Sequence, residues 1–227
     1  MKPTSATPLA ILKDVIHGTK QNAANPEWRD SVRAELALLP RLAGKTLPTL
    51  VQMKRGQRTS LLEVLQENAR EAGHELAIEM GDDRLTWRTL ERLTSRIAHV
   101  LNGLGVRPGD VVALVGTNSP MYVALVLGCT RVGATTAMIN SNLRGKPLSH
   151  ALLVSKAHVV LVEASLASAV AERDDLSALR VMTFGQGELE GELQKAPAAS
   201  YPPAPVSVED DFIYIYTSGT TGLPKPC

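Results

Sequence analysis

The stretch VVALVGTNSPMYVALVLGCTRVGATTAMIN, residues 111–140, decides the fold class. It opens on five apolar residues, Val111–Val115, a pattern typical of a strand that is buried on both faces of a parallel sheet. Pro120 suits the first turn of a helix that we expect to run to about Arg131. A second strand is predicted at Thr135–Ile139. The succession of strand, helix and strand indicates two parallel neighbours joined by a helical crossover.

The same alternation continues towards the end of the chain. A helix is predicted at Pro147–Ser155 and a third strand at Val159–Val162. A weaker helix within 164–182 and a strand at Arg180–Phe184 follow, and the apolar run Phe212–Tyr216 returns to the sheet. These elements together predict an α/β fold made of βαβ units around a parallel sheet.

The residues before this region predict two helices and a strand. Ser60, with Glu63 three residues later, has the pattern of a capping box at the start of a helix. A strand is expected at Leu76–Met80, with a tight turn after it, and Thr86 is expected to cap a long helix that ends at Gly105. The apolar face expected for the first helix consists of Leu61, Leu62, Leu65 and Ala69.

Two segments lack such patterns. Residues 185–208 are rich in Gly, Pro, Ala and Glu and are expected to form a surface loop. Prolines interrupt residues 1–58, which we interpret as an N-terminal extension to a domain at 59–227. Within the extension, Arg41–Arg58 is basic with scattered leucines. We favour a wrapping segment, and the alternative is a peripheral contact with an anionic membrane surface.

Composition excludes several classes of protein. Hydrophobic residues make up 44% and charged residues 21%, as in globular proteins, and the formal charge of +1 gives no reason to expect a nucleic-acid partner. Cys129 and Cys227 form neither a disulfide framework nor a metal-binding spacing, which favours a cytoplasmic protein, with the inner membrane face as the peripheral alternative. We expect no signal peptide and no membrane-spanning segment.

The stretch YTSGTTGLPK, residues 216–225, is the strongest functional signal. Its glycines allow backbone amides to approach a phosphate, its hydroxyls add donors, and Lys225 adds a positive charge. The spacing is not that of a Walker P-loop, because Gly219 and Gly222 are three apart and the lysine lies between Pro224 and Pro226. Flanking prolines exclude a helix interior and predict an extended segment. We therefore expect a clamp for a polyphosphate.

This stretch resembles the phosphate-binding signature of the adenylate-forming, AMP-binding superfamily. The resemblance extends over about residues 60–225 and includes LTWRTLERLTSRIAHVLNGLGVRPGDVVALVGTNSP. The segment INSNLRGKPLSH, together with IYIYTSGTTGLPK, is most similar to the branch of long- and very-long-chain fatty acyl-CoA synthetases and fatty-acid transport proteins. Pro226 departs from the small residue that commonly follows the lysine in this family.

The resemblance implies an ATP-dependent acid–thiol ligase with fatty acid, ATP and coenzyme A as its substrates. A fatty acid would react with ATP to give acyl-AMP, and coenzyme A would then displace AMP. Lys225 would be catalytic, and Mg²⁺ would bridge the phosphates, with no metal-binding residue assigned in this chain. The residues implied in nucleotide binding are Tyr216, Thr217, Ser218, Gly219, Thr220, Thr221, Gly222 and Lys225.

In the family, the adenine pocket, the glutamate motif associated with Mg²⁺ and a distal lysine all follow this signature. We therefore expect the chain to be an N-terminal part of such an enzyme, with an incomplete sheet in which Val111–Val115 and Phe212–Tyr216 form unpaired edges. Two alternatives stay open. One is a non-catalytic α/β module that binds nucleotide weakly, and the other is an adenylating enzyme for another carboxylic acid.

Other polar residues have plainer interpretations. The five histidines are dispersed without metal-binding spacing and are expected to be structural or exposed. Asn118, Asn140 and Asn142 follow predicted strands, where ligands of α/β sheets bind, but turn hydrogen bonds are the favoured interpretation.

Overall fold

The computed structural model of the chain describes residues 60–206, 209–218 and 224–226. These residues all belong to one compact unit, Thr59–Cys227. The extension predicted at 1–58 lies outside the described residues, and so does the basic segment Arg41–Arg58 with its predicted membrane contact.

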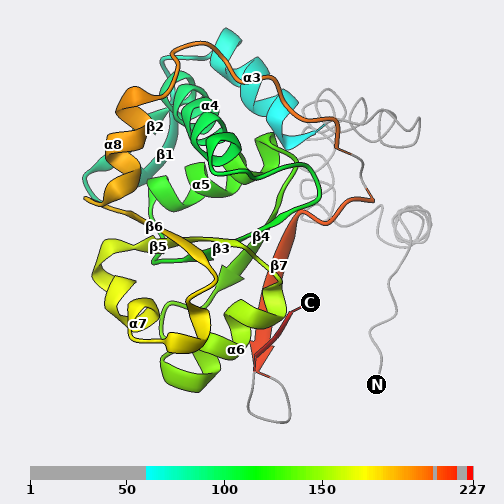
Figure 1. Ribbon diagram of the computed structural model, residues 1–227. Coiled ribbons are helices and arrows are strands. Elements are labelled where there is room, and N and C mark those ends of the chain that lie inside the picture. The colour runs from blue at the N-terminus through cyan, green and yellow to red at the C-terminus, as the bar shows by residue number, and fades with distance from the viewer. Residues whose placement is uncertain (1–59, 207–208, 219–223, 227) are drawn as a thin grey trace, which may run out of the picture. The chain divides into compact units, whose positions relative to one another are not determined.

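A six-stranded sheet organises the described residues (Figure 1). Its order is β6-β5-β3-β4-β7-β8; the first five strands are parallel and β8 is antiparallel to β7. The predicted α/β fold with a parallel sheet is confirmed. The predicted edge at Val111–Val115 is wrong, because that strand pairs with a neighbour on each side. The strands are β3 Val111–Val115, β4 Thr135–Ile139, β5 Val159–Glu163, β6 Arg180–Phe184, β7 Ile213–Ser218 and β8 Pro224–Pro226.

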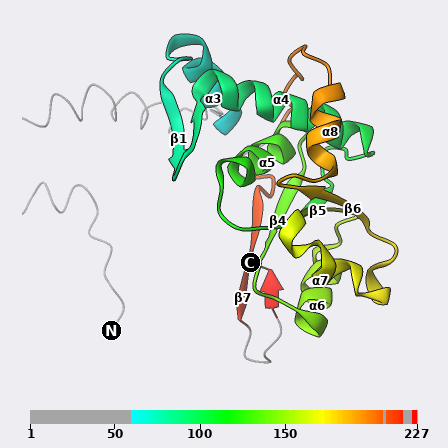
Figure 2. The ribbon, with the colours of Figure 1, turned by 90° about the vertical axis from the view of Figure 1, so that its left-hand side faces the viewer.

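Helices cover both faces of the sheet (Figures 1 and 2). One face, called the α5 face, packs against α4, α5 and α8, and the other, called the α6 face, packs against α6 and α7. Each face has its own cluster of buried apolar side chains, since successive residues of a strand point to opposite sides. The helices are α4 Trp87–Gly103, α5 Pro120–Arg131, α6 Gly145–Ser155, α7 Ala167–Ala171 and α8 Glu188–Lys195.

A helix and a hairpin precede α4. Helix α3, Leu61–Glu71, begins with the predicted capping box between Ser60 and Glu63. The predicted strand β1, Leu76–Met80, pairs with a second strand, β2 Asp83–Thr86, that the sequence did not indicate. Leu62 and Leu65 are buried as expected, but the inclusion of Leu61 in the apolar face is wrong, because its side chain is 51% exposed.

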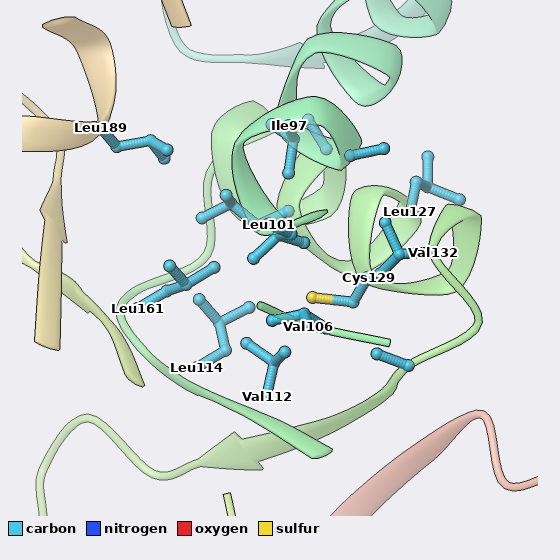
Figure 3. Close-up of a cluster of buried hydrophobic side chains, with 14 of the residues drawn as sticks. Ile97, Leu101, Val106, Val112, Leu114, Leu127, Cys129, Val132, Leu161 and Leu189 are labelled. Atoms are coloured by element: carbon cyan, nitrogen blue, oxygen red, sulfur yellow. The ribbon is translucent and has the colours of Figure 1, made fainter. Parts of the chain in front are cut away.

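The α5 face is closed by tight packing between α4 and α5. Thr86 caps α4 as predicted, its hydroxyl accepting a hydrogen bond from the Thr89 amide. Gly128 lets α5 approach α4, because a Cβ at this position would lie 2.3 Å from Cγ2 of Ile97. Below the helices, Leu114 and Leu161 point from the sheet towards Leu101 (Figure 3). This packing buries the middle of the sheet.

The loop predicted at 185–208 is wrong over its first half, where α8 forms. Its leucines, Leu189 and Leu193, are four residues apart and are buried against the α5 face. The Glu190 carboxylate accepts hydrogen bonds from the amides of Gly185 and Gly187, both at 2.8 Å, and so fixes the start of the helix. A short amphipathic helix was thus concealed by the composition of the residues that follow it.

The helix predicted within 164–182 is shorter than a regular crossover helix. Helix α7 has five residues, and single 3₁₀ turns at Ala164–Leu166 and Asp174–Leu176 flank it. Val170 and Leu176 are nevertheless buried in the α6-face cluster. The predicted strand after it, β6, is present with the predicted bounds.

Candidate phosphate-binding hairpin

Strands β7 and β8 form a hairpin at the edge of the sheet (Figure 2). The first half of β7 pairs with β4, with Ala137 opposite Tyr214. The second half pairs with β8, with Thr217 opposite Lys225 and Ser218 opposite Pro224. The glycine- and threonine-rich residues 219–223 lie outside the described residues. Strand pairing places Ser218, the residue before them, opposite Pro224, the residue after them.

The lysine of this hairpin occupies an extended segment, as its neighbouring prolines predicted. Pro224 and Pro226 flank Lys225 within β8, which is the last strand in the order of the sheet. Proline has no amide hydrogen and is tolerated on an edge strand, where only one side of the strand is paired. The backbone of Lys225 is therefore held against β7 without a helix, unlike the lysine of a Walker P-loop.

Tyrosines on β7 attach the hairpin to the rest of the unit. Tyr214 and Tyr216 pack against the α6-face cluster. The Tyr214 hydroxyl donates a hydrogen bond to Asp211 (2.8 Å), which raises the pKa of the phenol. Burial raises the pKa of Tyr216 to about 12, with a smaller opposing effect from Ser155. The Tyr216 hydroxyl is buried without a well-formed hydrogen bond in the described part of the chain, so this ring acts as a packing anchor.

A second polar feature lies at the carboxyl ends of β3 and β5. One Glu163 carboxylate oxygen accepts hydrogen bonds from the Thr117 amide (2.7 Å) and the Thr117 hydroxyl (2.8 Å), and the other accepts one from Ser165 (2.9 Å). The segment after β3 leads to α5 on the α5 face, whereas the segment after β5 leads to α7 on the α6 face. The connections of these two neighbouring strands therefore diverge at their carboxyl ends. Ligands of open α/β sheets commonly bind at such a point. Here the Glu163 side chain, at the end of β5, bridges to Thr117, which follows β3.

The Thr117 amide, followed by the Thr117 and Ser165 hydroxyls, lowers the pKa of Glu163 against the opposing effect of partial burial. The backbone at Gly116, next to Thr117, packs closely against the Phe184 ring, because a Cβ at Gly116 would lie 2.6 Å from that ring. Sequence reasoning missed Glu163. The available signal was a single carboxylate at the end of an apolar run, Val159–Val162, at the ligand-binding edge of the sheet.

Asn140, which follows β4, takes part in a turn hydrogen bond, as the favoured interpretation of this residue expected. The Asn140 side chain accepts a hydrogen bond from the Asn142 amide (2.9 Å), a local turn interaction. Arg144 donates to the carbonyls of Ser141 (2.6 Å) and Leu143 (2.8 Å) in the same turn. These side chains stabilise the turn that leads to α6.

The described residues contain neither a metal-binding cluster nor a helix that could span a membrane. In residues 60–206, 209–218 and 224–226, no group of three or more His, Cys, Asp or Glu side chains could hold a metal ion. Over the same described residues, no helix is long and apolar enough to cross a membrane.

The sequence model of AMP-binding enzymes matches residues 65–227, which contain the parallel sheet and the hairpin. The chain belongs to the AMP-binding enzyme family. The predicted family resemblance is thereby confirmed, and the two ends of the YTSGTTGLPK stretch lie on paired strands at the edge of the sheet.

Relatives within the AMP-binding enzyme family point to the predicted branch. The chain is 36% identical over 202 residues to the medium/long-chain-fatty-acid–CoA ligase FadD6 of Mycobacterium tuberculosis, covering 82% of this chain and 33% of the ligase. It is 35% identical over 188 residues to long-chain fatty acid transport protein 2 of Rattus norvegicus, covering 77% and 30%. The chain thus spans about a third of the length of these relatives.

A solved structure shares the fold. The anthranilate CoA ligase AuaEII, in complex with anthranoyl-AMP, superposes with a TM-score of 0.68 at 25% identity, over 73% of this chain and 33% of the ligase. The arrangement of sheet and helices described above is therefore one that an acid–CoA ligase uses.

Half of the nucleotide-binding residues predicted from the sequence belong to the described part of the chain. Tyr216, Thr217 and Ser218 end β7, and Lys225 lies on β8 across from Thr217. The remaining predicted residues lie outside the described residues; they are Gly219, Thr220, Thr221 and Gly222.

Proposed function

We propose that this chain supplies the triphosphate-binding part of an ATP-dependent ligase that joins a long-chain fatty acid to coenzyme A. Membership of the AMP-binding enzyme family and the two fatty-acid-related relatives support the reaction class. The observation that carries the proposal is the pairing of Thr217 with Lys225, which brings the two ends of the YTSGTTGLPK stretch together at the edge of the sheet.

The hairpin gives each part of this stretch a role. Thr217–Gly222 wraps the β- and γ-phosphates with backbone amides and hydroxyls, and Lys225 neutralises part of the negative charge. Because β7 is paired with β4 and β8, and Tyr216 is packed against the α6 face, the ends of the loop are held before the nucleotide binds. Donors positioned in advance stabilise developing charge without reorganisation.

The proposed reaction proceeds in two steps. A carboxylate oxygen of the fatty acid attacks the α-phosphorus of ATP, and the bond from that phosphorus to the bridging oxygen breaks, releasing pyrophosphate. The coenzyme A thiolate then attacks the acyl carbon and AMP leaves. In-line attack at phosphorus depends on positioning and on charge neutralisation. Lys225 and the loop amides act in the first step, where charge accumulates on pyrophosphate.

Mg²⁺ is expected with ATP, but the described residues do not fit a metal site of their own, because they hold no cluster of carboxylate, histidine or cysteine ligands. Magnesium in nucleotide sites keeps several waters and is bound largely by substrate phosphates. We therefore assign no step to an ion held by this chain.

Nucleotide binding by the 227-residue chain tests the role of the hairpin. ATP and pyrophosphate are expected to compete for one weak site, and AMP is expected to compete poorly, because the loop contacts the β- and γ-phosphates. Lys225→Ala should weaken ATP binding at least about tenfold, about 1.4 kcal/mol, while Lys195→Ala on α8 should leave it unchanged. Equal affinity for AMP and ATP, or an unaffected Lys225→Ala variant, contradicts the assignment.

Catalysis is tested separately by AMP release that depends on fatty acid and coenzyme A. The 227-residue chain alone is expected to release none above a Lys225→Ala control, because it spans about a third of its ligase relatives. In a longer enzyme that contains this chain, Lys225→Ala and Thr220→Ala should slow acyl-AMP formation more than thioester formation from supplied acyl-AMP. Equal slowing of both steps would contradict these roles, since pyrophosphate leaves after the first step.

The fold is shared with an anthranilate CoA ligase, so a different carboxylic acid is the second candidate substrate. Comparing a long-chain fatty acid with an aromatic acid in the acyl-AMP assay separates the two. Faster adenylation of the aromatic acid would overturn the fatty-acid assignment and leave the hairpin assignment standing.

A further inference from the structure

A concave surface that plays no part in the proposed reaction lies on α4. The chain after α8 crosses over this helix (Figure 1). Between them lies an open cavity of about 600 Å³. We call this cavity the α4 groove. It is lined by Thr89, Glu91, Arg92, Leu93, Ser95, Arg96, Ala198 and Ser200.

The wall of the α4 groove is fixed by several contacts. The Tyr201 amide donates to the Ser95 hydroxyl (2.6 Å), and the His99 ring donates to the Ala199 carbonyl (2.9 Å). The rings of His99 and Tyr201 meet edge to face, with 5.0 Å between their centroids. Further along, the Ala204 amide donates to the Arg131 carbonyl (2.9 Å). The groove is therefore formed before any ligand arrives.

Two arginines of the α4 groove have no polar partner within the residues that the structure describes. Arg92 is exposed and Arg96 is half-buried, and within the described part of the chain neither side chain makes an ion pair or a hydrogen bond. Residues four apart lie on the same side of a helix, where like charges destabilise each other. A third arginine, Arg88, stands one turn earlier and donates to the His74 ring (3.2 Å). An anion between Arg92 and Arg96 would relieve this repulsion.

The one carboxylate among the described lining residues is already committed. Glu91 forms an ion pair with Arg131 (2.8 Å), and the Arg131 side chain is completely buried. The Glu91 carbonyl also accepts a hydrogen bond from Arg131 (3.2 Å). A buried guanidinium that lost this carboxylate would be left with an unpaired charge, at a large energetic penalty. Glu91 therefore does not neutralise Arg92 or Arg96.

We propose that the α4 groove binds a small phosphorylated organic molecule. Arg92 and Arg96 hold the phosphate, because the planar guanidinium group forms paired, charge-assisted hydrogen bonds with phosphate oxygens. The Thr89 and Ser200 hydroxyls line the same groove, and Leu93 with Ala198 offers an apolar surface to the organic part. The volume lies within the usual range for small-molecule sites, and a concave groove fits a discrete molecule better than a flat membrane surface.

Phenyl phosphate, phenol and inorganic phosphate are suitable probes for the 227-residue chain. Binding is followed by the amide NMR signals of α4 and residues 196–204. We expect phenyl phosphate to bind more tightly than inorganic phosphate, phenol not to bind, and added salt to weaken the interaction. The double variant Arg92→Gln/Arg96→Gln should bind phenyl phosphate at least about tenfold more weakly, and Arg92→Lys/Arg96→Lys should recover part of the affinity.

Two controls separate this site from others. Arg180→Gln removes an exposed arginine that lines a different cavity, and Lys225→Ala disables the proposed phosphate-binding hairpin; neither should change the affinity for phenyl phosphate measured at the groove residues 89–96. Thermal unfolding of the double glutamine variant checks that it is folded, and Arg96→Gln alone provides a second variant. The proposal is overturned if no α4 signal shifts, if Arg92→Gln/Arg96→Gln binds normally, or if only Lys225→Ala reduces binding. It is also overturned if the two arginines matter only for anionic vesicles and not for phenyl phosphate.

Discussion

One row of side chains crosses the α5 face of the sheet, and its two ends lie in opposite environments. The row runs through neighbouring strands as paired residues, from Met182 through Leu161, Leu114 and Met138 to Ile215. Leu161 and Leu114 are completely buried and Met182 is 7% exposed, whereas Ile215 is 54% exposed. The apolar run of β7 thus resembles that of β3 in sequence but not in environment.

The difference follows from what covers each strand. Packing of α4, α5 and α8 encloses β3, its neighbour β5 and, next to β5, strand β6. Strand β7 is paired with β4 through Ile213–Ile215 and with β8 from Tyr216 onwards, so within the described residues Ile213–Ile215 has a neighbour on one side alone. The predicted unpaired edge at Phe212–Tyr216 therefore holds for this part of β7. Stability resides in the covered end of the row, and the candidate phosphate site is attached to the exposed end.

The largest effect is expected at the centre of the row. Leu114→Ala should lower the free energy of unfolding by about 3–5 kcal/mol, the range for leucines whose removal leaves a cavity in a closed core. Urea unfolding of the 227-residue chain, followed by circular dichroism, gives this value. A loss below about 1 kcal/mol would mean that the α5 face can collapse around the cavity and that β3 is no better enclosed than β7.

The second effect concerns the helix contact that covers β3. Gly128→Ala should lower the free energy of unfolding by about 1–3 kcal/mol, because the new methyl group would meet Ile97 at 2.3 Å. The matched control is Gly191→Ala in α8, where nothing lies within 4 Å of the new Cβ. That change should raise stability by about 0.5–1 kcal/mol, since alanine favours a helix. The same sign for both variants would contradict the close packing of α4 on α5.

The third effect tests the polar bridge at the carboxyl ends of β3 and β5. The pKa of Glu163 is lowered in the folded chain, chiefly by the Thr117 amide, so the folded state binds the proton less readily than the unfolded one. The resulting stability is present above the ordinary glutamate pKa, about 4.3, and is lost as pH falls through the lower, folded value. Glu163→Gln should remove this pH dependence and about 1 kcal/mol of stability at neutral pH.

Unfolding titrations at neutral and acidic pH measure this effect, with Glu172→Gln as the control. Glu172 is exposed beside α7, and its side chain makes no hydrogen bond in the described part of the chain. Parallel pH profiles for the wild-type chain and Glu163→Gln would show that the bridge contributes nothing to folding.

The sequence predicted the strands and helices of the covered end well, because their signals are local, but it wrongly left Val111–Val115 as an unpaired edge. Val111–Val115 is uniformly apolar, and Pro120 and Thr86 mark helix starts that depend only on neighbouring residues. Helix α8 was missed because two leucines and Glu190 define it, while the flanking prolines and alanines dominate the composition. The sequence predicted the unpaired edge of β7 but not the exposure of the Ile215 side chain on the α5 face, since that depends on which helices cover this face.

The polar residues of the candidate sites also differ in how far the sequence could predict them. A motif of fixed spacing identifies Thr217 and Lys225 from sequence, but their pairing across the hairpin is a property of the fold. The bridge between Glu163 and Thr117 joins residues 46 positions apart, and the α4 groove brings Arg92 beside Ser200. Such juxtapositions have no local signal, because each depends on strand order or on the path of a connecting segment.

The smallest effect is expected at the exposed end of the row. Ile215→Ala removes as many carbon atoms as Leu114→Ala, from a residue two strands away in the same row. Because the Ile215 side chain is already 54% exposed, its removal leaves no closed cavity, and stability should change by no more than about 0.5 kcal/mol. The same urea titration measures it, and ATP binding should persist, since the pairing of Thr217 with Lys225 involves only the backbone. A loss close to that of Leu114→Ala would mean that Ile215 is covered in solution, and it would remove the distinction between the two ends of the sheet.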